Sequence, residues 1–284
     1  MLVRKPKGQH VNLFFWEAEP QTVLEEMSSG RTKPLLCTCS ARKVSLFSPR
    51  QQTVGTDLLD DFVVKFADSG ELTPRGRLCE FTAALLAQYL GVPVVEPAIV
   101  TISDEFALIL PPTQKPAVKP GNYRHFGSRY LGSGWVIYVP GKQLEKSLLD
   151  SALCIYVFDM LIQNGDRRNG KPNVMTDGEA LKAYDHELAF PFLFPLLEEK
   201  REAWQVQHLK CATNHVFFPL LHGHKLDLEP CIESIRGLKD DIMQISGAIP
   251  AEWSSKDLDT IFLHLAQVRD NVDKFADEIT RVLK

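Results

Sequence analysis

The sequence has 284 residues, 44% of them hydrophobic and 24% charged, which suits a globular chain with one large domain or two lobes. Its formal net charge of −4 argues against a general nucleic-acid binder, for which a basic balance is expected. No apolar run reaches the ~18–20 residues of a membrane helix, so we expect no membrane partner. The six cysteines form no C-x-x-C pair and are expected to be reduced thiols in a soluble, cytoplasmic protein.

Residues 1–135 are expected to form a β-rich region with one prominent helix. That helix is predicted at 73–90, where apolar residues recur at helical spacing and Gly91 supplies a stop. A shorter helix is predicted at 20–27, and a Pro- and Lys-rich loop at 111–127. Strands are predicted at 33–40, 61–66, 92–102, 105–110 and 128–131.

Residues 136–284 are expected to be mostly helical. The apolar run at 141–162 predicts one helix, and 254–283 predicts a long amphipathic helix capped by Ser254 or Ser255. The exception is 172–185, where two short strands flank a turn signal at Asp177 and Gly178. The two parts are expected to join near residues 132–142.

The stretch "QNGDRRNGKPN", residues 163–173, follows the apolar helix directly. Its eleven residues include three asparagines, one aspartate, three cations, two glycines and a proline. A turn needs one or two of these residues, whereas a site that handles phosphate and metal would use most of them. The loop is therefore the strongest candidate for a functional site.

Transfer of a phosphoryl group from ATP needs several parts in a fixed arrangement. One carboxylate takes the acceptor's proton, a second carboxylate and an amide oxygen hold Mg²⁺, and a lysine paired with a glutamate meets the phosphates. The sequence supplies these parts in order: Lys65 in a strand, Glu80 on the next helix, Asp166 in the polar loop, Asn173 at its end, and Asp185 after the hairpin.

Each signal is weak alone, because Lys65 could face solvent and Glu80 could be a surface carboxylate.

The sequence gives less support to other kinds of active site, since the chain lacks the G-x-x-x-x-G-K-[ST], G-x-S-x-G and H-E-x-x-H motifs. His215, His222 and His224 lie near Cys211, but partners at the usual zinc spacing are missing. Cys37 and Cys39 alternate along a strand, which favours packing over chemistry.

The segments "FDMLIQNGDRRNGKPNVM" and "LKAYDHELAF" resemble the HipA-like kinases, in their single-domain branch, and more distantly the phosphoinositide 3-/4-kinase superfamily. Those families carry an Asn-x-Asp-Arg motif, a metal asparagine downstream and an aspartate after a hairpin. The segments "SGRTKPLL", "VVKF", "CEFTAALLAQYLGVPVVEPAIV", "HFGSRYL" and "AIPAEW" extend the resemblance over residues 20–255.

The resemblance implies an α+β, two-lobed protein-kinase-like fold, with a β-rich N-terminal lobe (1–135), an α-rich C-terminal lobe (136–284) and an ATP cleft between them. The whole chain, 1–284, would be one HipA-like kinase domain. The resemblance makes Asp166 the catalytic aspartate, Asn173 and Asp185 the ligands of Mg²⁺, and Lys65 the ATP lysine with Glu80 as its partner.

The segment 28–34 is expected to precede the first strand and could bind phosphate through its backbone, or be an ordinary turn. Its candidate residues are Ser29, Gly30, Arg31 and Lys33.

The loop departs from the usual kinase pattern in two places. The metal asparagine is usually five residues after the aspartate, where this chain has Lys171, so Asn169 competes with Asn173. Arg168 stands where a histidine often follows Asp-Arg, and its guanidinium could stabilise charge on the γ-phosphoryl group or be a surface cation.

The motifs and the resemblance together predict an ATP- and Mg²⁺-dependent HipA-like kinase. The resemblance alone implies a protein Ser or Thr hydroxyl as acceptor and a small antitoxin-like regulator as a further partner. Two alternatives stay open. One is a nucleotide-binding pseudokinase that acts as a regulatory module, and the other is a lipid or small-molecule kinase.

Overall fold

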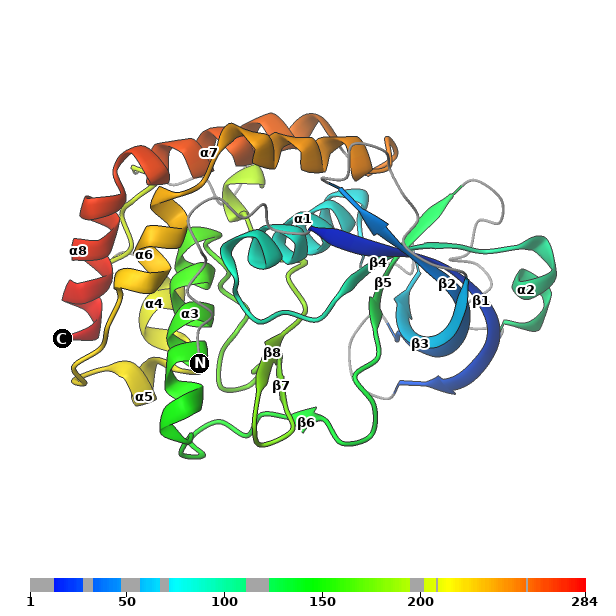
Figure 1. The fold of residues 1–284 in the computed structure, drawn as a ribbon, viewed down its shortest axis with the longest axis horizontal. Coiled ribbons are helices and arrows are strands. Elements are labelled where there is room, and N and C mark those ends of the chain that lie inside the picture. The colour runs from blue at the N-terminus through cyan, green and yellow to red at the C-terminus, as the bar shows by residue number, and fades with distance from the viewer. Residues whose placement is uncertain are drawn as a thin grey trace.

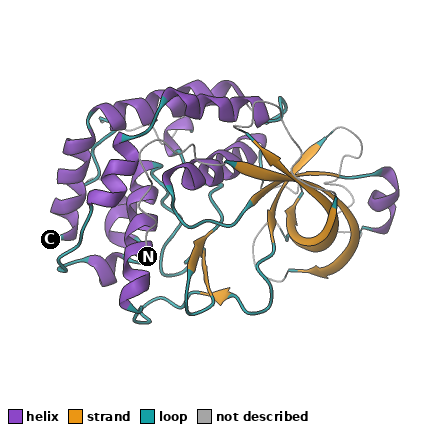
Figure 2. Ribbon diagram, in the orientation of Figure 1, coloured by secondary structure: helices purple, strands orange, loops and turns teal. Residues whose placement is uncertain are grey.

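The computed structural model describes residues 13–27, 33–46, 57–66, 72–110, 123–194, 202–207, 209–253 and 255–284. The chain forms a mixed α+β structure in which strands gather at one end and helices at the other (Figure 1; Figure 2). Among the described residues, no helix combines the length and apolar character needed to cross a membrane.

Five strands close into a barrel in the order β1-β2-β3-β5-β4. They are β1 (Phe14–Glu26), β2 (Leu35–Ser45), β3 (Leu58–Lys65), β4 (Pro97–Thr101) and β5 (Arg124–Arg129). Neighbouring strands are antiparallel except β1 and β4, which close the barrel in parallel. Gly127 permits a close approach of β4 and β5, because a Cβ there would lie 2.7 Å from Val100 Cγ2.

The barrel interior is apolar, and β2 alternates buried and partly buried residues along its first half. Cys37 and Cys39 both face this interior, so the prediction that they pack in the core is confirmed. Burial raises the pKa of the Cys37 thiol to about 12, which keeps it protonated and unreactive at neutral pH.

Helix α1 (Pro74–Leu90) connects the barrel with the helical end. Thr73 caps it by accepting a hydrogen bond from Gly76 N, and Gly91 ends it in the left-handed conformation with φ 76°. The helix is buried on nearly all sides, and its Phe81 ring packs edge-on against Phe15 of β1 at 5.3 Å. This position holds Glu80 rigidly beside the barrel.

The helical end contains one large apolar core. Its α-helices are α3 (Lys146–Leu161), α4 (Lys210–Asn214), α5 (Phe218–Leu221), α6 (Glu229–Arg236), α7 (Leu258–Asp270) and α8 (Val272–Leu283), and short 3-10 turns are η2 (Pro191–Leu193), η4 (Asp240–Ala248) and η5 (Ser255–Asp257). Eleven residues of α3 are buried, so this helix is a rigid base for the loop that follows it.

A three-stranded sheet, β6-β7-β8, lies between the barrel and α3 in the view of Figure 1. It consists of β6 (Val136–Ile137), β7 (Val174–Thr176) and β8 (Leu181–Ala183). The predicted hairpin is confirmed, and its turn is held by Asp177 Oδ1, which accepts from the backbone N–H groups of Glu179 and Ala180. A bridge from Val94 to Ala183 ties the segment after α1 to this sheet.

Two short elements were predicted with the wrong type. The helix expected at 20–27 is the second half of β1, because this segment pairs with β2 up to Glu26 and tertiary pairing overrides local preference. The strand expected at 105–110 is the helix α2 (Asp104–Ile109), which Ser103 caps by accepting from Phe106 N.

Three boundaries also differ from the prediction. The helix expected at 254–283 is broken at Asn271 into α7 and α8, and α7 begins after Asp257 with no side-chain cap bond. Ser254, one predicted cap, lies outside the described residues, while Ser255 begins η5. Strand β5 includes residues 124–127, which were predicted as loop, because they pair with both β3 and β4.

Candidate active site

Lys65, Glu80 and Asp185 come from three different elements and meet at one point. Lys65 ends β3, Glu80 lies on α1, and Asp185 follows β8. The Lys65 ammonium forms an ion pair with Glu80 Oε1 and another with Asp185 Oδ1 at 2.6 Å. Only 14% of the Lys65 side chain is exposed, so this lysine is not the solvent-facing strand residue that the alternation alone would favour. The structure therefore brings together the lysine, its glutamate and the aspartate after the hairpin.

The contacts shift the ionisation of these groups in opposite directions. Burial would lower the pKa of Lys65, but the carboxylates of Asp185 and Glu80 outweigh it and raise the pKa. Burial would raise the pKa of Asp185, but the Lys65 ammonium holds it at about 2. Burial raises the pKa of Glu80 to about 7 despite the lysine. Asp185 is therefore an anion and Lys65 a cation at neutral pH.

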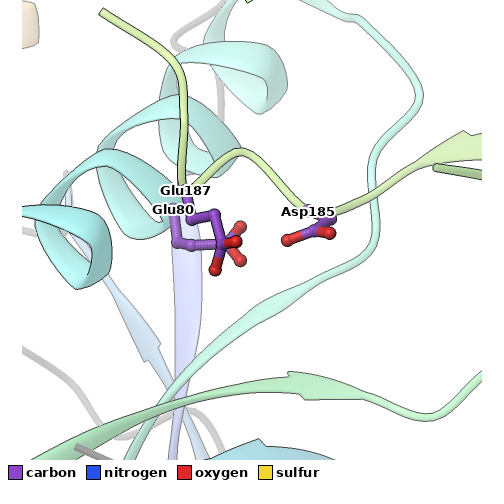
Figure 3. A group of neighbouring side chains, drawn as sticks. All are labelled: Glu80, Asp185 and Glu187. Atoms are coloured by element: carbon purple, nitrogen blue, oxygen red, sulfur yellow. The ribbon is translucent and has the colours of Figure 1, made fainter. Parts of the chain in front are cut away.

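Glu187 is a third carboxylate at this point, and the sequence analysis missed it. Its Oε2 lies 4.0 Å from Lys65 Nζ, and carboxylate oxygens of Glu80, Asp185 and Glu187 all lie within 4.8 Å of one another (Figure 3). Glu187 Oε2 is buried and has no hydrogen-bond partner within the described part of the chain. Its place two residues after Asp185 was the available signal. Three carboxylates share one ammonium here, which leaves an excess of negative charge.

Glu80 also fixes the backbone beside Asp185. Its Oε2 accepts a hydrogen bond of 2.6 Å from His186 N, while its Oε1 meets Lys65. Asp185 itself has a left-handed backbone with φ 61°, which is uncommon outside glycine. One buried glutamate thus holds both the lysine and the segment that carries the aspartate.

Asp166 lies in the loop after α3, buried and next to two cations. Its backbone N–H donates to Asn164 Oδ1 at 3.2 Å, and the Asn164 amide donates to Asp159 Oδ1 at 3.1 Å. Lys171 Nζ lies 3.1 Å from Asp166 Oδ2, and Arg168 Nε lies 3.9 Å from Asp166 Oδ1. The polar loop therefore folds so that its aspartate faces its own cations.

A buried polar network holds this loop from behind. Arg167, fully buried, donates from Nε to Asp159 Oδ2 at 2.5 Å, and from Nη1 to the carbonyl oxygens of Asn173 and Tyr184. His215 Nε2 lies 2.8 Å from Asp159 Oδ2. Arg167 thus ties the loop of Asp166 to the residues that flank both ends of the hairpin.

The sequence analysis did not assign Asp159, Arg167 or His215 to this network. The signal for Asp159 was present, since it is the one charged residue in the apolar run 151–162. The Arg167 guanidinium and His215 hold the pKa of Asp159 below its usual range, although burial alone would raise it. Arg167 Nη2 also lies 2.9 Å from His186 Nε2, and burial, together with that guanidinium, lowers the pKa of His186 to about 3.

The two candidate asparagines have different surroundings. Asn173 is 6% exposed, has φ 47°, and its Nδ2 is buried without a hydrogen-bond partner among the residues described. Asn169 is exposed in the turn between Arg168 and Lys171. Asn173 adjoins Tyr184 across the hairpin, through the bond from Tyr184 N to Asn173 O. Of the two, Asn173 is therefore the one built into the site.

The candidate phosphate-binding residues of the segment 28–34 and the candidate zinc residues lie outside the carboxylate cluster or outside the described residues. Ser29, Gly30 and Arg31 lie outside the described residues, and Lys33 is exposed with φ 43° just before β2. The prediction that their segment precedes the first strand is wrong, because the segment connects β1 with β2. Within the described ranges, His215, His222, His224 and Cys211 do not gather into a group that could hold a metal, and His215 contacts Asp159.

The buried histidine predicts how stability depends on pH. Burial lowers the pKa of His215 below its ordinary value of 6.5, so the folded protein keeps the ring neutral. Below that ordinary value the unfolded chain binds a proton that the folded protein does not. The free energy of unfolding should therefore fall as pH decreases from 7 to 5, by up to about 1.4 kcal/mol per pH unit for each such histidine.

Urea unfolding between pH 5 and 7.5 measures this slope. His215→Gln keeps an N–H donor for Asp159 but does not titrate, so it should show a shallower dependence than the wild type. Equal slopes in the two proteins would contradict the neutral, buried state of His215.

One family of known proteins matches this chain over most of its length. A model of the HipA-like kinase family matches residues 21–279, and the chain therefore belongs to that family. Among solved structures, the chain is similar to the crystal structure of a Helicobacter pylori proinflammatory kinase, CtkA. The identity is 12%, the TM-score is 0.48, and the match covers 93% of this chain and 97% of that one. A search of curated proteins gave no match.

The family resemblance inferred from the motifs is thus confirmed. Membership makes the protein a kinase-type phosphotransferase, and it implies the use of ATP.

Proposed function

We propose that the chain is an ATP- and Mg²⁺-dependent kinase that phosphorylates a protein Ser or Thr hydroxyl. The observation that carries the proposal is the meeting of Lys65, Glu80 and Asp185 from a strand, a helix and a post-hairpin segment. In this proposal the whole chain, 1–284, is one two-lobed domain. Residues 1–135 and 136–284 form its lobes, and ATP binds in a cleft between them.

Lys65 is the residue proposed to contact the ATP phosphates, with Glu80 holding its ammonium in place. An ion-paired lysine at the end of a strand fits this role, because its side chain is fixed before the nucleotide arrives. The segment with Ser29, Gly30, Arg31 and Lys33 is proposed to meet the phosphates from the β1–β2 connection. Support for that part is its place between the first two strands of the barrel.

Asp185 and Asn173 are the proposed ligands of Mg²⁺. A carboxylate and a side-chain amide supply the oxygen donors that this cation prefers, and the two residues flank the hairpin, Asn173 before β7 and Asp185 after β8. The excess of carboxylates around Lys65 also suits a cation. Bound Mg²⁺ would neutralise charge on the phosphates and orient them.

Asp166 is the proposed acceptor of the hydroxyl proton. As the hydroxyl oxygen bonds to the γ-phosphorus, the bond from that phosphorus to the β,γ-bridging oxygen breaks. The electron pair stays with ADP, and the proton passes to the Asp166 carboxylate and then to solvent. Arg168, 3.9 Å from Asp166, is close enough to contribute positive charge at the same place.

The acceptor and the partners follow from the family rather than from a contact. Membership in the HipA-like kinase family supports a protein Ser or Thr hydroxyl as the acceptor. Family membership also supports a small antitoxin-like regulator as a binding partner.

Nucleotide binding gives a direct test. A ligand at 100 times its Kd stabilises the native state by about 2.7 kcal/mol, which corresponds to a rise in Tm of roughly 5 °C for a chain of this size. MgATP should therefore raise the Tm of the wild type, and Lys65→Ala should reduce this rise.

Lys225→Ala is the matched control, because Lys225 is exposed in the loop after α5 and lies outside the proposed site. Its Tm should rise with MgATP as the wild type's does. A wild-type melting curve that saturating MgATP leaves unmoved would refute both an active kinase and a nucleotide-binding pseudokinase.

A further inference from the structure

Lys171 is the cation that lies closest to the Asp166 carboxylate. Its Nζ is 3.1 Å from Asp166 Oδ2, whereas Arg168 Nε is 3.9 Å from Oδ1. Arg168 is also the more exposed of the two side chains, at 54% against 40%. The loop motif alone favoured Arg168 as the cation that stabilises charge on the γ-phosphoryl group. The distances to Asp166 favour Lys171 instead.

The backbone holds Lys171 in this position. Arg168 N donates to Lys171 O at 2.9 Å and Lys171 N donates to Arg168 O at 2.8 Å, which closes a tight turn through Asn169 and Gly170. On its other side Arg168 bridges to His215, and Val216 N donates to Arg167 O. The turn is therefore attached to the buried Asp159 network, and its lysine projects from a fixed base.

Lys171 and Asp166 also lie within electrostatic reach of the carboxylate cluster. Both charges act on Glu187, whose carboxylate is 4.0 Å from Lys65 Nζ. The ammonium of Lys171 thus pairs with the Asp166 carboxylate and lies within electrostatic range of Glu187, which belongs to the carboxylate cluster around Lys65. A phosphoryl group that is transferred to an acceptor hydroxyl beside Asp166 would have Lys171 as a neighbour.

We propose that Lys171 binds the γ-phosphate oxygens of the nucleoside triphosphate and stabilises the charge on them during transfer. This role rests on the kinase function proposed above. In the absence of nucleotide the ammonium pairs with Asp166. When the acceptor hydroxyl donates to Asp166, the ammonium can donate to the γ-phosphate while the bond to ADP breaks, because a lysine has three N–H donors and can contact both groups at once.

A purely structural role for Lys171 gives a different expectation. If the lysine only holds Asp166 in place, its removal slows transfer but does not weaken binding of a group that mimics the transferring phosphoryl. If it contacts that group, its removal weakens binding of the mimic and spares MgADP. The complex of MgADP with aluminium fluoride is such a mimic, and transition-state analogues bind more tightly than substrates when these contacts are present.

The experiment measures the Kd of MgADP, with and without aluminium fluoride, by titration calorimetry for the wild type and four variants. Lys171→Ala should lose at least ~100-fold of affinity for the fluoride complex, the scale of one lost donor to transition-state charge, with MgADP changed by less than about threefold. Lys171→Arg should restore most of the loss, because it keeps a cationic donor. Arg168→Ala should lose less than about tenfold of its affinity for the fluoride complex, and Lys225→Ala should bind the complex as the wild type does.

Full affinity of Lys171→Ala for the fluoride complex would overturn the proposal, and so would a larger loss in Arg168→Ala than in Lys171→Ala. Tight binding of MgADP by the wild type with no gain from fluoride would also overturn it, while nucleotide binding itself would stand. Failure of the wild type to bind MgADP at all would remove the proposed function, and this role of Lys171 with it.

Discussion

Replacement of Asp166 by asparagine should reduce phosphoryl transfer by about 10²–10⁴-fold, the range for loss of a positioned general base, while MgATP still binds. The substitution keeps the size of the side chain and one oxygen that can accept a hydrogen bond from Lys171. It removes the negative charge that accepts the hydroxyl proton. Initial rates of label transfer from ATP, together with titration calorimetry, separate the two effects.

Asp177→Asn is the matched control for this variant. Asp177 is exposed in the hairpin turn and accepts two backbone hydrogen bonds through one oxygen, which an asparagine can replace. Its transfer rate should equal that of the wild type. Near-normal transfer by Asp166→Asn would show that the carboxylate does not handle the proton.

Replacement of Asp159 by alanine should have the largest effect on stability. The change leaves the guanidinium of Arg167 buried without its carboxylate and removes the acceptor of His215. Loss of one partner from a buried charge pair costs about 3–5 kcal/mol. Urea unfolding at pH 7.5 would measure the change in the free energy of unfolding.

Asp150→Ala provides the comparison, because Asp150 lies on the same helix but is exposed. Its free energy of unfolding should stay within about 0.5 kcal/mol of the wild type. If Asp159→Ala were as stable as Asp150→Ala, the network behind the Asp166 loop would not hold the fold together.

The motifs of the site could be predicted because each depends on short-range sequence. Helix α1 has a Thr73 cap and a Gly91 stop, and the turn of the hairpin has its own signal at Asp177 and Gly178. These local signals placed Lys65 in a strand and Glu80 on the next helix in the correct order. The contact between the two side chains then followed from the family arrangement.

The two elements that were predicted with the wrong type differ from the prediction for different reasons. Residues 20–26 form a strand because they pair with β2. The sequence of 20–27 by itself does not indicate this pairing. Residues 105–110 contain β-favouring side chains, yet the Ser103 cap and the acidic first turn stabilise a helix.

The parts of the site that sequence reasoning missed depend on contacts that only the folded chain makes. Asp159 and His215 are 56 positions apart, and only the folded chain shows that they share a hydrogen bond. Glu187 was close to a predicted residue, but its side-chain direction depends on how the segment after β8 turns beside α1. The carboxylate of Asp159 in the apolar run 151–162 was the one sequence signal for the network of Asp159, Arg167 and His215.

The most direct measurement is incubation of the wild type and Asp166→Asn with γ-labelled ATP, Mg²⁺ and a cell lysate, followed by separation of proteins, lipids and small molecules. We expect label on Ser or Thr of a protein with the wild type and none above background with Asp166→Asn. Label in the lipid or small-molecule fraction would contradict the proposed acceptor. Absence of label from every fraction, in a wild-type protein whose Tm rises with MgATP, would contradict the kinase reaction and indicate a pseudokinase.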